Sequence, residues 1–313
     1  ARGVGVFVED PRPGAFDVGA ARPERVLATF TLAEPGPLVA HFFTAAEPLD
    51  LLRRYAALAG LPAAPPLWAF SPQQWRNVHT SSAEVRSDAL AMRANDIPGS
   101  VLWIDNPWQT AYNTFEFDES RFAEVDALLA ELAGLGYRVL VWSTPYVNQG
   151  GLTASDFAEA ASAGYLARDS RGNPMVFPWQ EGPGCLVDFT APGATAWWRE
   201  RIGRALARGV SGFKLDYGED LVPELLGNLT RFSVAAGNTQ VMHNAYAAGY
   251  HEAYLGALPA GDGFVITRAG SFGEQTVDTC IWPGDLDSNL LPHGAPNDDG
   301  KRHVGGLPAA IAA

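Results

Sequence analysis

The stretch SGFKLDYGED, residues 211–220, places one lysine and three acids at the end of an apolar run. Such a run is typical of a buried parallel strand whose carboxyl end reaches a binding or catalytic site. Asp220 directly precedes the apolar segment LVPELL, and an acid is favoured at a helix N-terminus, so we interpret Asp220 as structural. Asp216 lies inside the run, where that explanation fails. Lys214 is one of only two lysines in the chain, which makes its place two residues before Asp216 informative.

Strand and helix patterns alternate on both sides of this stretch. The expected strands are 66–72, 99–106, 137–147, 211–219, 239–244 and 263–270. The expected helices are 81–96, 120–136, 191–209, 220–237 and 245–258, with a long loop at 170–184 and a last helix beginning near Val304. Strands joined by helices are parallel, and their short continuous apolar runs indicate burial on both faces.

Polar residues end several of these strands, namely Asp105, Asp216, Asn244 and Arg268. In a (β/α)8 barrel the carboxyl ends of the strands form the active site, so the pattern predicts an α/β fold of the TIM-barrel type. A doubly wound sheet would alternate in the same way, but no glycine-rich phosphate loop follows the first strand.

The first 62 residues have a different pattern. Segments 3–10, 25–32 and 38–44 are β-rich, and residues 48–60 have helical spacing with a glycine stop. We therefore expect one domain over 1–62 and a barrel domain over 63–313 that contains six strands.

Composition narrows the classes of partner. The net charge of -13 repels phosphate backbones and anionic lipid, which argues against nucleic acid and membranes as partners. The two cysteines and six histidines have no metal-ligand spacing, so no metal site is expected. The first residues lack the apolar segment of a signal peptide; the compartment stays open between cytoplasm and secretion, and a homo-oligomer stays open as well.

Two carboxylates are candidates for chemistry. Lys214 points to the same side of its strand as Asp216, and a cation there would keep Asp216 ionised. Asp285 follows Trp282 in the turn WPGD, and a carboxyl group beside an indole can act as a proton donor near neutrality. One charged carboxylate and one proton donor are what glycoside hydrolysis needs. For Asp285 the alternative is an ordinary Gly-Asp turn. For the acids of DYGED the alternative is ligation of Mg²⁺.

Longer segments resemble glycoside hydrolase family 31, the retaining α-glycosidases, in the branch with F-K-x-D-x-G-E. The similar segments are GVGVFVEDPRPGAFDVG (3–19), PPLWAFSPQQWRN (65–77), VLWIDNPWQTAYNTFEFDESRF (101–122), LVDFTAPGATAWWRE (186–200), GFKLDYGE (212–219), MHNAYAAGYHEA (242–253) and VITRAGSFGEQTVDTCIWPGD (265–285). The resemblance implies that Asp216 is the nucleophile and Asp285 the general acid/base. It also implies that residues 1–62 include the end of an N-terminal β-sandwich.

The expected substrate site follows from the same comparison. The resemblance implies that Asp105 accepts hydrogen bonds from sugar hydroxyls and that Arg268 and Trp282 line the sugar site. We add Lys214 and the loop residue Glu219, and we favour Trp75 and Trp179 as aromatic platforms for a sugar face. The expected partner is then an oligosaccharide or glycoside substrate, which is an α-glucoside, an α-galactoside or an α-xyloside. No cofactor is needed.

Two departures from the family pattern stand out. Thr144 occupies a position before proline where the family often has Asp or Asn. The last two barrel strands are also missing from our assignment, so we expect a barrel that is incomplete at its C-terminal end and a chain that is part of a longer enzyme. An α-transglycosylase, or a carbohydrate-binding homologue with impaired turnover, is the alternative function.

Overall fold

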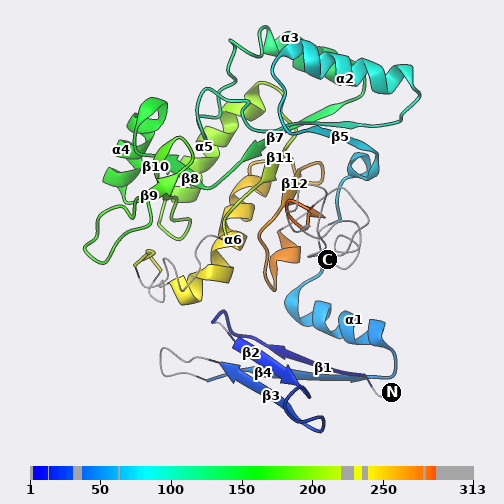
Figure 1. Cartoon of the computed structure of the whole chain (residues 1–313), viewed down its shortest axis with the longest axis vertical. Helices are drawn as coiled ribbons and strands as arrows, with labels where there is room; N and C mark the ends of the chain where they lie inside the picture. Colours follow the sequence, from blue (N-terminus) through cyan, green and yellow to red (C-terminus); the bar gives the residue numbers. More distant parts are fainter. Residues whose placement is uncertain are drawn as a thin grey trace, which may run out of the picture.

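A computed structural model describes residues 3–12, 14–30, 37–62, 64–219, 229–234, 239–277 and 280–286. In the N-terminal part, β1 (Gly3–Val8) pairs with β4 (Ala40–Ala45), and β2 (Gly14–Val18) pairs with β3 (Val26–Phe30). Both pairs are antiparallel, and helix α1 (Pro48–Ala59) follows them (Figure 1).

The described part of the barrel domain contains one curled sheet of six parallel strands, in the order β13-β12-β11-β7-β6-β5 (Figure 1). Its strands are β5 (Gln73–Arg76), β6 (Val101–Ile104), β7 (Arg138–Ser143), β11 (Gly212–Leu215), β12 (Phe264–Thr267) and β13 (Cys280–Ile281). The helices between them are α2 (Ser82–Ala94), α3 (Val125–Gly134), α5 (Ala194–Ala207) and α6 (Thr239–Leu255). The arrangement is that of an incomplete barrel.

Alternation along each strand separates two buried layers. Phe213 and Leu215 of β11 belong to the large core that the helices cover. Residues with the opposite orientation, Val101, Trp103, Leu140 and Phe264, form a second, smaller cluster on the inner face. Because successive side chains of a strand point to opposite faces, Lys214 and Asp216 point to the inner side.

The segment between β7 and α5 builds a small antiparallel sheet of its own. It contains β8 (Tyr146–Asn148), helix α4 (Ala154–Ala163), β9 (Phe177–Trp179) and β10 (Gly182–Leu186). The strand order is β8-β10-β9. The expectation of a long loop at 170–184 is therefore wrong for the hairpin β9–β10, whose turn is formed by residues 180–181.

Two of the six expected strands are also wrong. Residues Leu67–Phe70 form the short 3-10 helix η1 after Pro66, and the strand begins only at Gln73, because Pro72 lacks the N–H that a strand ladder needs. Residues 239–244 begin α6 instead, since the buried residues Met242, Tyr246 and Tyr250 recur every four positions. The short strand β13 completes the described set of six.

Other expectations lie wholly or partly outside the described residues. Of the helix expected at 220–237, only 229–234 are described, and they are not helical. The helix expected near Val304 lies outside them altogether, as does Asp220.

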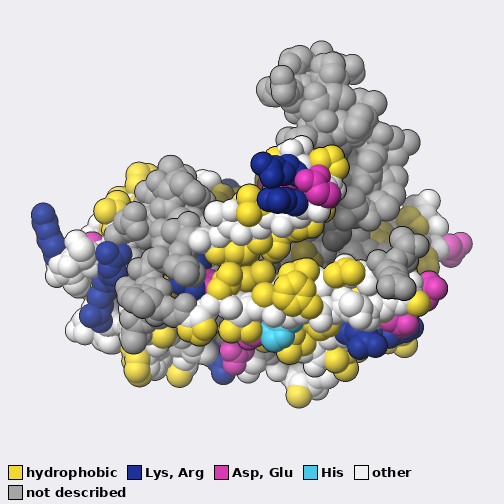
Figure 2. Space-filling view, turned by 90° about the horizontal axis from the view of Figure 1, so that it is seen from below, with side chains coloured by type: hydrophobic (Ala, Val, Ile, Leu, Met, Phe, Trp, Pro, Cys, Tyr) yellow, Lys and Arg dark blue, Asp and Glu magenta, His cyan; other side chains and the backbone are white. Residues whose placement is uncertain are grey.

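The N-terminal strands expose much apolar surface. Hydrophobic side chains gather on the side of the molecule seen in Figure 2, where these strands lie. Exposed apolar residues of these strands are Val4, Val6, Phe16, Val18, Val26, Leu27 and Phe42. Within the described ranges, no helix has both the length and the apolar character needed to cross a membrane.

Candidate active site

Asp216 lies immediately after β11, and its backbone N–H still donates to Ser143 O of the neighbouring strand β7, at 2.9 Å. The residue is 7% exposed. Its Oδ2 accepts a hydrogen bond from Trp142 Nε1 at 2.9 Å, and its Oδ1 accepts one from the Tyr217 N–H at 2.9 Å. Arg268 Nη1 lies 2.6 Å from the same Oδ1. An ionised carboxylate is an acceptor only, and here each of its oxygens has a donor.

Lys214 has a different partner from the one expected. Its Nζ lies 2.8 Å from Asp105 Oδ2, which also accepts from Trp75 Nε1 at 2.7 Å. The ammonium lies 5.4 Å from the centre of the Trp75 ring and 5.0 Å from that of Trp282. Lys214 therefore pairs with Asp105, and the cation that contacts Asp216 is Arg268. That Lys214 helps to keep Asp216 ionised stays a prediction.

Arg268 connects the nucleophile candidate to the loop that follows it. One end of its guanidinium group binds Asp216, and Nη2 binds Glu219 Oε1. The guanidinium carbon lies 4.5 Å from the centre of the Tyr217 ring. Tyr217 and Gly218 both have positive φ, at 61° and 98°, so the backbone turns sharply directly after Asp216.

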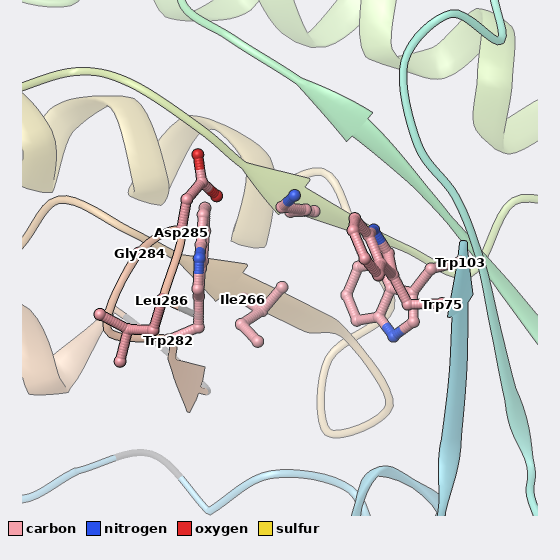
Figure 3. A pocket seen from close by; sticks show the side chains of 8 residues that line it. Trp75, Trp103, Ile266, Trp282, Gly284, Asp285 and Leu286 are labelled. Atoms are coloured by element: carbon pink, nitrogen blue, oxygen red, sulfur yellow. The ribbon is translucent and has the colours of Figure 1, made fainter. Parts of the chain in front are cut away.

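A cavity of about 280 Å³ opens beside Lys214, and Asp216 and Arg268 are not among the residues that line it. It is lined by Trp75, Trp103, Lys214, Ile266, Trp282, Gly284, Asp285 and Leu286. Figure 3 shows Trp282 and Asp285 on one side of the cavity and Trp75 and Trp103 on the other. The volume is near the lower end for small-molecule pockets, roughly 300 Å³. Flat aromatic walls beside a few polar groups suit a sugar ring, which has apolar faces and a polar rim.

Trp179 is not among the residues that line this cavity. It stacks on Tyr146, with ring centres 4.0 Å apart and an interplanar angle of 18°. It also meets Tyr217 edge to face at 4.7 Å. Trp179 therefore supports the turn next to Asp216, and a direct contact with a sugar stays a prediction.

The sequence does not single out two aromatic residues of the site, although Trp103 is one of the tryptophans at strand ends or loops from which Trp75 and Trp179 are favoured. Trp142 donates to Asp216, and Trp103 lines the cavity. A signal was present for Trp103, because it lies two residues before Asp105 and shares its side of the strand. The register of the parallel sheet, which the sequence does not reveal, places Trp142 level with Lys214.

Thr144, which departs from the family pattern, is fully buried. Its Oγ1 accepts a hydrogen bond from Asn113 Nδ2 at 2.8 Å. The same side chain of Asn113 accepts from Ser143 Oγ at 3.1 Å. Thr144 thus belongs to an internal network that fixes the end of β7.

The described residues contain no group of three or more His, Cys, Asp or Glu side chains placed to hold a metal ion. Asp216 and Glu219 both contact the guanidinium group of Arg268. Of the acids considered as Mg²⁺ ligands, Asp220 lies outside the described residues.

Comparison with known families identifies the domain. Residues 62–293 match the model of the glycosyl hydrolases family 31 TIM-barrel domain. The chain belongs to glycosyl hydrolase family 31. Among its family 31 relatives, the alpha-xylosidase XylQ of Lactiplantibacillus pentosus is 31% identical over 258 residues, which cover 81% of this chain and 32% of that protein. The alpha-glucosidase 2 of Bacillus thermoamyloliquefaciens is 28% identical and covers 90% of this chain and 36% of its own length.

Solved structures share the fold. The dextranase of Flavobacterium johnsoniae superposes with a TM-score of 0.80 at 23% identity, over 90% of this chain and 35% of that one. The cycloalternan-degrading enzyme from Trueperella pyogenes gives 0.79 at 23% identity, over 92% and 44%. The chain spans about a third of the length of the curated relatives that it matches.

Proposed function

We propose that this chain carries the catalytic site of a retaining α-glycosidase, with Asp216 as nucleophile and Asp285 as general acid/base. The observation that carries the proposal is the buried Asp216 carboxylate at the end of β11, which is held by Trp142, Tyr217 and Arg268. A nucleophile must stay fixed while the sugar approaches, and three donors from three different elements restrict its movement.

The reaction has two steps. A carboxylate oxygen of Asp216 attacks the anomeric carbon, the bond to the leaving oxygen breaks, and the carboxyl proton of Asp285 passes to that oxygen. The product is a β-linked glycosyl ester of Asp216. Asp285, now ionised, takes a proton from water, whose oxygen attacks the anomeric carbon and releases Asp216 and an α-configured sugar.

The other residues of the site bind the sugar in this proposal. Lys214 lines the cavity between the indoles of Trp75 and Trp282 and offers a donor group, and its partner Asp105 offers an acceptor group next to it. Arg268 binds both Asp216 and Glu219, and in this proposal Arg268 and Glu219 contact hydroxyl groups of the sugar.

The substrate class is an α-linked glycoside with a terminal sugar small enough for the cavity. The names of the relatives, alpha-xylosidase and alpha-glucosidase, support α-xylosides and α-glucosides as first candidates, with α-galactosides as the third. A carbohydrate-binding homologue without turnover, or an α-transglycosylase, would use the same pocket.

We propose as well that residues 1–62 end an N-terminal β-sandwich and that 63–313 belong to the barrel domain. The exposed apolar side chains of β1 to β4 support the sandwich, because such a face is normally covered by a second sheet.

The test uses the full-length protein and the 4-nitrophenyl α-glycosides of xylose, glucose and galactose. Turnover of one of them, with the α-anomer as the first product seen by NMR, is expected. A 5-fluoro glycosyl fluoride of that sugar should then label the peptide that contains Asp216. The β-anomer as first product would contradict a retaining mechanism, and binding without turnover would favour the carbohydrate-binding alternative.

A further inference from the structure

Helix α6 presents three buried tyrosines that are four residues apart, Tyr246, Tyr250 and Tyr254. None of them is more than 1% exposed. Residues four apart lie on one face of a helix, so the three rings form a row against the sheet. The rings of Tyr250 and Tyr254 meet edge to face at 5.4 Å.

The three hydroxyl groups have different partners. Tyr246 donates to Val187 O at 2.8 Å, and Tyr254 shares a hydrogen bond of 2.6 Å with Ser143 Oγ. Tyr250 lies between them, and its hydroxyl lies 3.1 Å from Ser143 O and 3.3 Å from Asp216 O. Of the three, Tyr250 is the one whose hydroxyl reaches the backbone of Asp216.

These contacts converge on a single point between β7 and β11. Ser143 O, which accepts from Tyr250, also accepts from the Asp216 N–H at 2.9 Å. The Tyr250 hydroxyl has one hydrogen, which it shares between the carbonyls of Ser143 and Asp216. The Tyr250 hydroxyl therefore binds the backbone carbonyl of Asp216, while the backbone N–H of Asp216 binds β7.

The ring of Tyr250 supports the turn that follows. A Cβ added at Gly218 would lie 3.2 Å from Cδ1 of Tyr250, so the ring fills the space beside this glycine. Tyr217, with φ of 61°, is a non-glycine residue in the left-handed region, which persists only where its surroundings hold it. The Tyr250 ring packs beside the next residue, Gly218, and the Tyr217 side chain lies under Arg268.

We propose that Tyr250 is a positioning residue for Asp216: its hydroxyl and ring hold the turn 216–218, so that the carboxylate stays aligned with the anomeric carbon. This inference rests on the proposed function. Burial raises the pKa of Tyr250 well above its ordinary value of 10.0, so the hydroxyl keeps its proton near neutral pH and remains a donor. Tyr250 itself need not touch the sugar.

The test compares Tyr250→Phe with Tyr246→Phe in the full-length protein. Both variants lose one buried hydroxyl from the same face of α6, so a general loss of stability affects them alike. Tyr250→Phe should lower kcat by about 10- to 100-fold with KM nearly unchanged, because a small misplacement of a reacting group costs rate. Tyr246→Phe should keep the wild-type kcat.

The leaving group separates positioning of the nucleophile from loss of acid catalysis. The fall in kcat of Tyr250→Phe should be similar for 4-nitrophenyl and 2,4-dinitrophenyl α-glycosides, since both substrates need Asp216 equally. A deficit confined to the poorer leaving group would place the effect on Asp285 and overturn the proposal.

Hydrogen exchange supplies a readout that does not depend on turnover. The peptide that contains residues 212–219 should exchange faster in Tyr250→Phe than in the wild type, and at the wild-type rate in Tyr246→Phe. A wild-type protein that cleaves no glycoside would refute the proposed function, and the exchange comparison would still decide whether Tyr250 fixes the turn. Equal behaviour of the two variants in exchange would overturn the inference.

Discussion

The Asp216 carboxylate receives its donors from three parts of the chain, the β7 side chain of Trp142, the next backbone amide and Arg268 after β12. An alanine at this position removes the proposed nucleophile and leaves its donors around a space in which we expect a small anion to fit.

Asp216→Ala should therefore lower turnover of a 4-nitrophenyl α-glycoside by about 10⁴-fold or more. Added azide should restore part of the rate and give the β-glycosyl azide, because the anion attacks from the side where the carboxylate stood. The product's anomeric configuration is read by NMR. An α-configured azide, or a variant with normal activity, would remove Asp216 from the role of nucleophile.

Asp285 has a different environment, exposed at the cavity mouth beside Trp282. A general acid helps only when the leaving oxygen needs a proton. Asp285→Ala should lower kcat/KM strongly for a methyl or sugar leaving group, by about 10²- to 10⁴-fold, and much less for 2,4-dinitrophenolate. Steady-state kinetics over a series of leaving groups measures the difference. Equal losses along the series would mean that Asp285 only positions the sugar.

The secondary-structure elements that the sequence predicted best are those marked by a pattern within the segment itself. The strands around Val101, Val139, Phe213 and Phe264 are continuous apolar runs, and the structure contains all four. The sequence also predicted Asp105 and Lys214 in one site, because polar residues at the ends of parallel strands meet at one edge. The two side chains lie 2.8 Å apart, although only Lys214 lines the cavity.

The failures have physical causes in long-range contacts. Residues 239–244 read as a strand because the segment is short and apolar, and only packing of Met242 and Tyr246 against the sheet decides for the helix. The partner of Lys214 depends on the register between strands. The hydrogen bond between Tyr250 and Asp216 joins residues 34 positions apart. A single sequence carries no direct record of either.

The segment that connects β5 to α2 contains His79, whose protonation affects the stability of the fold. His79 is 1% exposed, and its Nε2 lies 3.2 Å from Asp88 Oδ2, which also binds Arg76. Burial lowers the pKa of His79 below its ordinary value of 6.5, against the opposing effect of Asp88. The unfolded chain therefore binds the proton more readily than the folded one, so the contribution of His79 to stability is lost as the pH falls through 6.5 and below.

We expect the free energy of unfolding of the wild type to fall between pH 7.5 and 5.5, and to fall less in His79→Gln. One proton can change stability by at most about 1.4 kcal/mol per pH unit. Urea unfolding at the two pH values measures the difference. Asp88 titrates below this window, because its own pKa is lowered from 3.8. Burial raises the pKa of Asp88, but the hydrogen bonds from Arg76 and His79 together lower it by more. A steeper pH dependence in the variant would contradict the assignment.

At the scale of the whole molecule, the N-terminal part touches the loop between β12 and β13. This loop begins at Arg268 and leads to Trp282 and Asp285, so its position matters for the site. Phe272 in the loop meets Phe7 of β1 edge to face at 5.2 Å. Gln275 Nε2 donates to Ala59 O at 3.1 Å and to Gly60 O at 3.0 Å, at the end of α1.

We therefore expect these contacts with the N-terminal part to hold the loop that carries Arg268 in position. Gln275→Glu is the sharpest probe, because glutamate keeps the size of the side chain and the acceptor that binds the Gly273 N–H, while its oxygens cannot donate to the two carbonyls. The two carbonyls are only partly buried, so losing their donor should cost less than the about 1–3 kcal/mol of a fully buried unpaired group. Thermal unfolding should reveal this loss, and kcat/KM on a 4-nitrophenyl α-glycoside should fall by about 3- to 10-fold as Arg268 loses its fixed place.

The loop is also anchored from the other side, which limits the expected effect. His251 of α6 lies 3.1 Å from Glu274 Oε2, so the loop is held between α6 and the end of α1. Loss of the Gln275 bonds should therefore loosen the loop without unfolding the barrel domain. Gln275→Glu with reduced stability but unchanged kcat/KM would mean that the contact with α1 stabilises the chain without positioning Arg268. Unchanged stability and unchanged kcat/KM together would show that α6 alone is enough to hold this loop.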